Sequence, residues 1–188
     1  MISKEKAINL FIALLTPLAI AAVAWAVLGI SPDRVNSGVI TLGALTVFCS
    51  CYLRIQLPRV NMHLTISDGL IILSMLLYGG EVALLIAVIE TTLASLNIRR
   101  QGVVIRPKTV VVNSYFAAFS VFVAAKASTA IFGSTDLILH RNDFTSFVWL
   151  LGTMALSLFL VNSVFVAVYN AINKQTSYWR IWTGNCLN

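Results

Sequence analysis

Apolar residues occupy most of the chain in six runs that short polar segments separate. The runs cover residues 7–30, 38–53, 68–80, 81–98, 109–132 and 145–172. A helix needs about 20 consecutive apolar residues to cross a bilayer core of roughly 30 Å. The third run is roughly 18 Å long at about 1.5 Å per residue, so we expect a short or re-entrant helix there. The pattern predicts an all-α integral membrane protein built as a bundle of six helical segments.

The stretch between the second and third runs follows a different pattern. Apolar and polar residues alternate between Ile55 and Ile66, and Pro58 interrupts the stretch. A period of two is typical of extended chain rather than of helix. We therefore predict an extended or interfacial segment over residues 54–67.

The composition excludes a soluble catalytic domain. Of 188 residues, 59% are hydrophobic and 11% are charged, and the mean hydropathy is +0.88, whereas soluble domains carry about 25% charged residues. One polytopic membrane domain, residues 1–173, and a cytoplasmic juxtamembrane tail, residues 174–188, account for the whole length. The last residues, 185–188, do not cap or terminate any element that we recognise. This favours the expectation that the chain is truncated from a longer protein.

The sequence holds no motif of an enzyme or a metal site. There is no Ser-His-Asp or Cys-His arrangement and no glycine-rich phosphate loop. The cysteines, Cys49, Cys51 and Cys186, lack the spacing of metal ligands. We expect no catalysis by this chain, no cofactor and no metal.

Basic residues are distributed unevenly between the two sides of a six-segment arrangement. Cytoplasmic loops of membrane proteins carry the excess of Lys and Arg, so the richer side is expected inside. Ten lie on one side: Lys4, Lys6, Arg54, Arg59, Arg99, Arg100, Arg106, Lys108, Lys174 and Arg180. Only Arg34 and Arg141 lie on the other side. The count predicts a multi-pass protein of the cytoplasmic (inner) membrane with both termini cytoplasmic, and it explains the net charge of +6 without a nucleic-acid partner.

The tail carries aromatic and basic residues side by side. Tyr178, Trp179, Arg180 and Trp182 follow one another closely. Such residues are enriched at the headgroup level of membranes. We predict that they anchor the tail to the membrane surface.

Two ionisable residues within the runs are candidates for a ligand site. Glu90 lies in the middle of the fourth run and Lys126 lies in the fifth. A charge in hydrocarbon costs roughly 2.5–3.5 kcal/mol on insertion scales, so both are expected to face protein or water. One hypothesis is a buried Glu90–Lys126 pair lining an outward-facing cavity. In the alternative, Lys126 extends to the interface and Glu90 is a protonated packing residue.

Three further polar residues have structural and functional interpretations. Asn113 and Asn162 are expected at similar depth, where their side chains would hydrogen-bond across a helix interface and hold the fifth and sixth helices in register. Asp68 is expected to cap the short third helix, with a ligand role as the alternative.

The residues 55–96, together with later motifs, resemble a bacterial signalling module. The relevant motifs are Ile55-Gln56-Leu57-Pro58, Ile66-Ser67-Asp68, Leu76-Leu77-Tyr78-Gly79-Gly80-Glu81, Val112-Asn113, Phe159-Leu160-Val161-Asn162-Ser163 and Tyr178-Trp179-Arg180-Ile181-Trp182. This pattern resembles the multi-helix membrane input module that precedes GGDEF or HD-GYP domains in cyclic-di-GMP signalling proteins. The resemblance implies an unknown small-molecule stimulus, passed through the fifth and sixth helices to a cytoplasmic effector, which in a longer protein would be a cyclic-di-GMP enzyme.

Other interpretations stay open. The stretch from Ser67 to Gly80 is similar to the S-components of energy-coupling-factor transporters, which implies a vitamin-like substrate and a separate energising partner. Small residues of the first run would then form a docking face: Ala19, Ala21, Ala22, Ala24 and Ala26. A scaffold subunit without a ligand is the third possibility. The lipid bilayer is a partner in every case, and a homodimer is compatible with the pattern.

Overall fold

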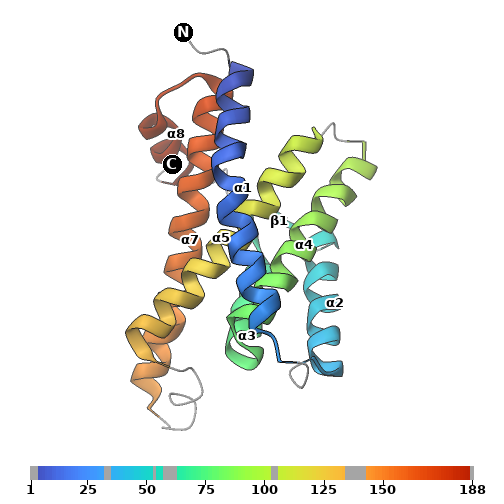
Figure 1. Cartoon of the computed structure of the whole chain (residues 1–188), viewed down its shortest axis with the longest axis vertical. Coiled ribbons are helices and arrows are strands. Elements are labelled where there is room, and N and C mark those ends of the chain that lie inside the picture. The colour runs from blue at the N-terminus through green and yellow to red at the C-terminus, as the bar shows by residue number, and fades with distance from the viewer. Residues whose placement is uncertain are drawn as a thin grey trace.

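Helices dominate the computed structural model, which describes residues 4–31, 35–52, 54–56, 63–102, 106–133 and 143–186 (Figure 1). The helices are α1 (Lys4–Gly29), α2 (Ser37–Tyr52), α3 (Ile66–Tyr78), α4 (Gly80–Arg100), α5 (Pro107–Phe132), α7 (Phe144–Lys174) and α8 (Tyr178–Cys186). Each apolar run corresponds to one of α1 to α5 or α7, and the ends agree within about three residues. Hydrophobic run length therefore located these helices correctly.

Four of the described helices, α1, α4, α5 and α7, are long and apolar enough to cross a membrane. The other two apolar helices are shorter, with 16 residues in α2 and 13 in α3. Long hydrophobic side chains on the outer faces of the helices are exposed, among them Leu14, Leu28 and Leu156. Such an apolar outer surface is suited to lipid rather than water. These features indicate a multi-pass membrane protein.

The segment that was expected to be extended contains a short two-stranded sheet. Strand β1 (Arg54–Gln56) pairs with β2 (His63–Thr65) in antiparallel register, with Arg54 opposite Thr65 and Gln56 opposite His63. The prediction of extended chain is thus confirmed for both strands. Helix α3 begins directly after β2, so the helix starts earlier than the sequence pattern indicated.

Helix α1 packs against α4, α5 and α7, which follow much later in the chain. Ala22 and Ala26 are buried in the same cluster as Ala83, Ala87 and Ala124. Small side chains allow helix backbones to approach closely, which is how membrane helices gain packing energy. The expected alanine docking face is therefore wrong for Ala19, Ala22 and Ala26, because these residues are buried inside the bundle.

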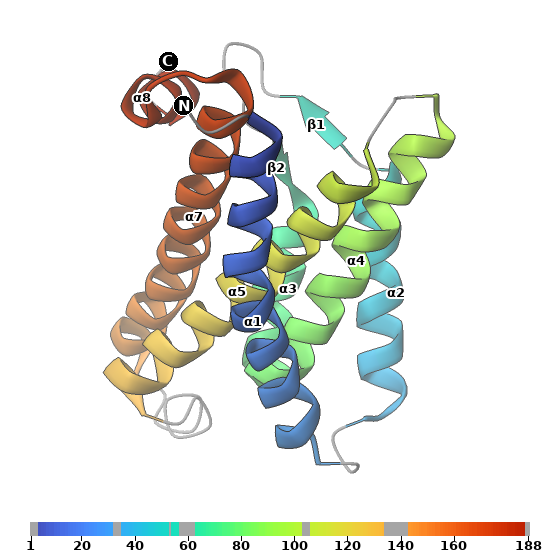
Figure 2. The ribbon, with the colours of Figure 1, turned by 45° about the horizontal axis from the view of Figure 1, so that its top comes forward.

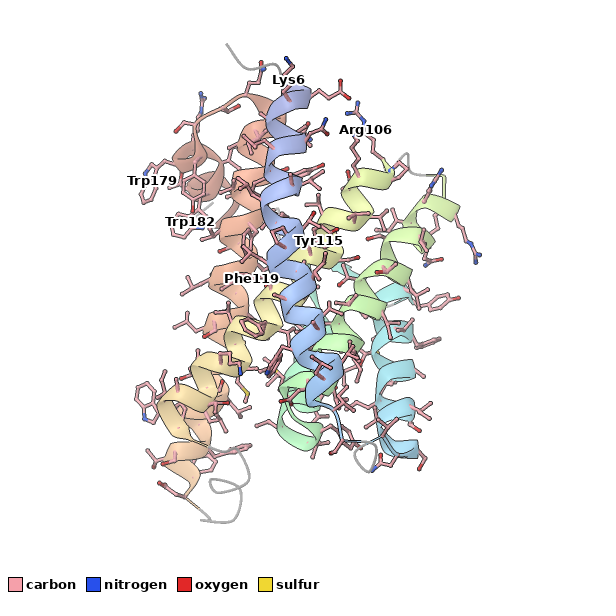
Figure 3. The ribbon with its side chains drawn as sticks, viewed as in Figure 1. Lys6, Arg106, Tyr115, Phe119, Trp179 and Trp182 are labelled. Atoms are coloured by element: carbon pink, nitrogen blue, oxygen red, sulfur yellow. The ribbon has the colours of Figure 1, made fainter. Side chains whose placement is uncertain are left out.

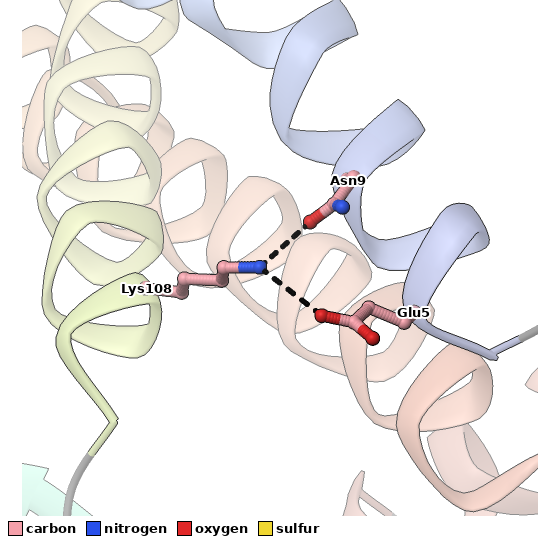
Figure 4. Close-up of polar contacts among 3 residues, drawn as sticks. All are labelled: Glu5, Asn9 and Lys108. Carbon is pink, nitrogen blue, oxygen red and sulfur yellow. Dashed lines mark hydrogen bonds and ion pairs between the residues drawn. The ribbon is translucent and has the colours of Figure 1, made fainter.

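The two ends of the bundle differ in which chain segments they hold. The beginning of α1, the end of α4, the beginning of α5, the end of α7, α8 and the two strands lie together at one end, which we call the termini end (Figure 2). At this end the Lys108 ammonium donates a hydrogen bond of 2.9 Å to Asn9 Oδ1 and lies 3.8 Å from Glu5 Oε1 (Figure 4). The beginning of α5 is thereby tied to the beginning of α1.

Two glycines form the connection between α3 and α4 at the opposite end. Gly79 has a φ of 92°, a conformation that L side chains rarely adopt. A methyl group on Gly80 would collide with Ala125 and lie 3.3 Å from the ring of Trp25. The first glycine thus makes the turn, and the second lets α4 approach α5 and α1.

Candidate functional site

A cavity of about 790 Å³ lies between α3, α4, α5 and α7, with α8 contributing Trp182. We call it the polar cavity, because its wall includes charged, amide and hydroxyl side chains from four helices. Among these residues are Asp68, Glu90, Asn113, Ser120, Asn162, Asn170 and Lys174. The remaining wall is mainly apolar and includes Phe116, Val121 and Phe159. Cavities of roughly 300–1,000 Å³ with a few polar groups in an apolar wall are typical of small-molecule sites.

Glu90 is the most buried ionisable group of the polar cavity. Its exposed fraction is 6%, and its Oε2 accepts a hydrogen bond of 2.9 Å from the Thr91 hydroxyl. Among the described residues no ion pair reaches this carboxylate. A buried carboxylate normally requires a cation or several donors, so a single neighbouring hydroxyl leaves it poorly satisfied.

Contacts between α4 and α5 place Glu90 relative to the residues of α5. The hydroxyls of Thr92 and Ser114 lie 2.8 Å apart, and Gly80 approaches Ala125 near the opposite end of the same antiparallel pair. This register puts Glu90 level with Phe116, between Asn113 and Ser120. Each of these two is therefore offset from Glu90 by about 5 Å along the helix axis.

The expected Glu90–Lys126 pair is not present among the described residues. The ammonium of Lys126 lies 4.4 Å from the ring centre of Trp25 and 5.8 Å from that of Phe122. Lys126 is nine residues beyond Ala117, a cavity residue, and at about 100° per residue it faces the opposite side of α5. It therefore contacts α1, where the aromatic faces attract the cation, instead of the cavity.

The polar cavity also differs in direction from the expected one. It includes Asp68 in the first turn of α3, Lys174 at the end of α7 and Trp182 on α8. The end of α7 and α8 lie at the termini end of the bundle (Figure 2), and α3 begins directly after β2. This cavity therefore reaches the termini end, whereas the hypothesis placed a cavity towards the far end.

Asn113 and Asn162 come together as wall residues of this cavity. No hydrogen bond joins them within the part of the chain that the structure describes. Asn162 is exposed and Asn113 is half-buried. The helices are linked instead by aromatic contacts, with the rings of Phe116 and Phe165 stacked at 5.1 Å, and by Thr109 and Tyr169, whose hydroxyls lie 3.2 Å apart.

Asp68 lies inside the first turn of α3 rather than at its cap. Because the helix begins at Ile66, the carboxylate is at a position where the helix dipole still favours a negative charge. It is exposed at the mouth of the polar cavity. The structure thus supports a helix-stabilising role and also places Asp68 at the candidate site.

Ser120 is the cavity residue that sequence reasoning missed. Its exposed fraction is 4%, and its Oγ is a buried side-chain atom without a hydrogen-bond partner among the described residues. Other hydroxyls of α5, those of Ser114, Ser128 and Thr129, donate hydrogen bonds to backbone carbonyls of their own helix. Ser120 follows Asn113 by seven residues, so both lie on one face of the helix. This spacing could have identified Ser120 from the sequence.

The aromatic residues of the tail lie on α8, where Figure 3 labels Trp179 and Trp182, and they differ in exposure. Trp179 and Arg180 are exposed, and Tyr178 is half-buried. Trp182 is half-buried, lines the cavity, and its indole N–H donates a 3.4 Å hydrogen bond to Ser163 Oγ on α7. A headgroup anchor stays a prediction for Tyr178, Trp179 and Arg180, whereas Trp182 contacts α7.

A second hollow, of about 820 Å³, lies between α2 and α4. We call it the α2–α4 groove. Its wall is almost wholly apolar and includes Val39, Gly43, Val47, Ile86 and Ile89, with Asn97 and Arg100 towards the termini end. The Asn97 side-chain amide donates a hydrogen bond of 3.3 Å to the Cys51 carbonyl and so holds the two helices together there.

No protein-family model, curated protein or solved structure matches the chain. The two hollows and the residues around them are therefore the features of the chain that bear on its function.

Proposed function

We propose that the chain is a membrane input module that binds a small molecule in the polar cavity and passes the change through α7 to a cytoplasmic effector. The observation that carries this proposal is the position of α7. One face of this helix forms a wall of the cavity, and the helix ends at Lys174, at the termini end of the bundle. A molecule entering the cavity therefore acts directly on the helix that leads out of the bundle.

Two further properties of α7 suit a transmitting helix. Its 31 residues give a length of about 46 Å, which exceeds a bilayer core of roughly 30 Å. It is the least buried of the four long apolar helices. A helix that buries little of its surface can change its packing at lower cost, and a switch needs two packings that a ligand distinguishes.

The orientation follows from the charges at the termini end. Lys4, Lys6, Arg99 and Arg100 belong to helix ends at that end, and the positive-inside rule then makes it cytoplasmic. The polar cavity would consequently open towards the cytoplasmic side of the inner membrane. This placement favours an intracellular small molecule, or one that has partitioned into the inner leaflet.

An uptake component is the alternative function, and the volume of the polar cavity suits it as well. A transporter component of this kind needs a docking face for its energising partner. Ala19, Ala22 and Ala26 are buried in the bundle, so only Ala21 and Ala24 of the expected docking face are exposed. This smaller face makes the input module the better-supported proposal.

The test joins a diguanylate cyclase domain to residue 188 of the full chain as a reporter. Ala155 lines the cavity on α7 and is exposed, so Ala155→Phe would place a phenyl ring in the space that the ligand would occupy. We expect cyclic-di-GMP in the cells to change at least threefold relative to the unmodified fusion. The neighbouring Leu156 is exposed on the outer face and lies outside the cavity wall.

Leu156→Phe is therefore the matched control and should leave the cyclic-di-GMP level unchanged. The proposal fails if Ala155→Phe and Leu156→Phe give the same level at equal expression. A change with both variants would indicate general disturbance of α7 and would also contradict it.

A further inference from the structure

The wall of the polar cavity contains two buried polar side chains with few hydrogen-bond partners among the described residues. Glu90 is 6% exposed, and Ser120 is 4% exposed. The carboxylate accepts one hydrogen bond from its neighbour Thr91. The Ser120 hydroxyl has no partner in the described part of the chain. Buried groups of this kind are stabilised by hydrogen bonds, so both can accept one from a polar ligand in the cavity.

The charges of the cavity wall determine which charge a bound ligand would carry. Lys174 lies at the end of α7 and Asp68 in the first turn of α3, whereas Glu90 lies in the middle of α4. Among the described residues no cation forms an ion pair with Glu90. This carboxylate in the inner part of the cavity therefore attracts a cation.

The apolar part of the wall excludes a bare metal ion as the best fit. Phe116, Val121 and Phe159 surround the polar groups, and the volume of about 790 Å³ far exceeds that of an ion. Within the described residues no group of three or more His, Cys, Asp or Glu side chains could hold a metal. A cationic group carried on an apolar body matches both parts of the wall.

We propose that the polar cavity binds a small organic ammonium compound whose cationic nitrogen lies between Glu90 and Ser120. An ammonium group has three N–H donors and no acceptor. One would go to the Glu90 carboxylate and one to the Ser120 hydroxyl, about one helical turn further from the mouth. The apolar body then packs against Phe116 and the facing wall of α7. The signalling role of this ligand rests on the proposed function, whereas its binding to the cavity does not.

The binding test uses the purified full chain in nanodiscs and three matched probes. Phenethylammonium, 2-phenylethanol and 3-phenylpropionate share the phenyl ring and differ in the charge of the end group. Benzylammonium and tryptammonium extend the series of amines. Calorimetry and thermal protection measure binding of each probe. We expect at least one amine to bind at least tenfold tighter than the alcohol and the acid.

Variants then locate the cationic end. Glu90→Gln should weaken the amine at least tenfold, and Ser120→Ala should weaken it about threefold or more, because each removes one hydrogen-bond acceptor or its charge. Glu81→Gln on α4 and Ser128→Ala on α5 are matched controls, since both residues lie outside the cavity wall. They should bind the amine as the unchanged protein does.

Several outcomes overturn the proposal. These are equal binding of amine, alcohol and acid, full amine affinity in both Glu90→Gln and Ser120→Ala, or equal protection by sodium chloride at the same concentration. If Glu90→Gln does not fold, Ser120→Ala decides alone. Failure of the reporter test with intact amine selectivity would refute only the signalling role. A responsive reporter without amine selectivity would refute only the ligand class.

Discussion

The polar cavity and the α2–α4 groove have nearly the same volume, about 790 and 820 Å³, but opposite chemistry. The groove is lined by side chains such as Val39, Val47 and Ile89, which lipid chains solvate without loss. The cavity contains Glu90 and Ser120, which lipid cannot satisfy. In a membrane protein, therefore, a hollow becomes a candidate site through the polar groups that it buries rather than through its size.

The largest expected effect comes from giving the groove the chemistry of the cavity. Ile86 is 7% exposed and faces Gly43 across the groove. Ile86→Asp should lower the free energy of unfolding by about 3 kcal/mol, because the charge has no partner in an apolar wall. Unfolding in a denaturing detergent measures the loss. Ile86→Val is the control, with an expected loss of about 1 kcal/mol, and equal stability of the Asp and Val variants would contradict the apolar character of the groove.

The converse change gives the cavity the chemistry of the groove. Glu90→Leu should raise the free energy of unfolding of the ligand-free protein by about 1–2 kcal/mol, because replacing a poorly paired buried charge with an apolar side chain is often stabilising. The same unfolding assay measures the gain. Glu81 lies in the first turn of α4 and is half-buried. Glu81→Leu is the control and should change the free energy of unfolding by less than about 0.5 kcal/mol. A clear destabilisation by Glu90→Leu would mean that the carboxylate has a structural partner.

The smallest expected effect separates two buried serines of α5. Ser128 Oγ donates to the Ala124 carbonyl, whereas Ser120 Oγ has no partner among the described residues. Ser128→Ala should cost about 1 kcal/mol, and Ser120→Ala should cost nothing or stabilise slightly without ligand. Thermal unfolding of the two variants side by side checks the difference. Equal losses would show that Ser120 is satisfied in the protein.

Hydrophobic run length predicted the helices well, because a bilayer forces each apolar run into a closed backbone structure. The start of α3 was missed by two residues, since the alternating pattern of β2 continues into Ile66 without a break. Glu90, Asn113 and Asn162 were recognised because a polar side chain in an apolar run is conspicuous. Their common cavity was not predictable, because it depends on how α4, α5 and α7 pack.

The sequence could not determine which side chains contact one another in and around the candidate site. Depth alone suggested that Lys126 pairs with Glu90, but depth ignores which way a side chain faces around the helix axis. Lys126 instead contacts Trp25 and Phe122. Ser120 was overlooked because most serines in membrane helices bond to their own backbone, and only the packed structure distinguishes an exception.

The packing of α1 has a consequence for the order of events during synthesis. This helix leaves the ribosome before its partners α4, α5 and α7, which follow much later in the chain. Until then Ala22 and Ala26 face lipid or the insertion machinery without their final neighbours. The waiting helix is also the most apolar of the four long ones, so it can persist alone in the bilayer. Biogenesis should accordingly tolerate delays in the later helices better than the loss of hydrophobicity in the first.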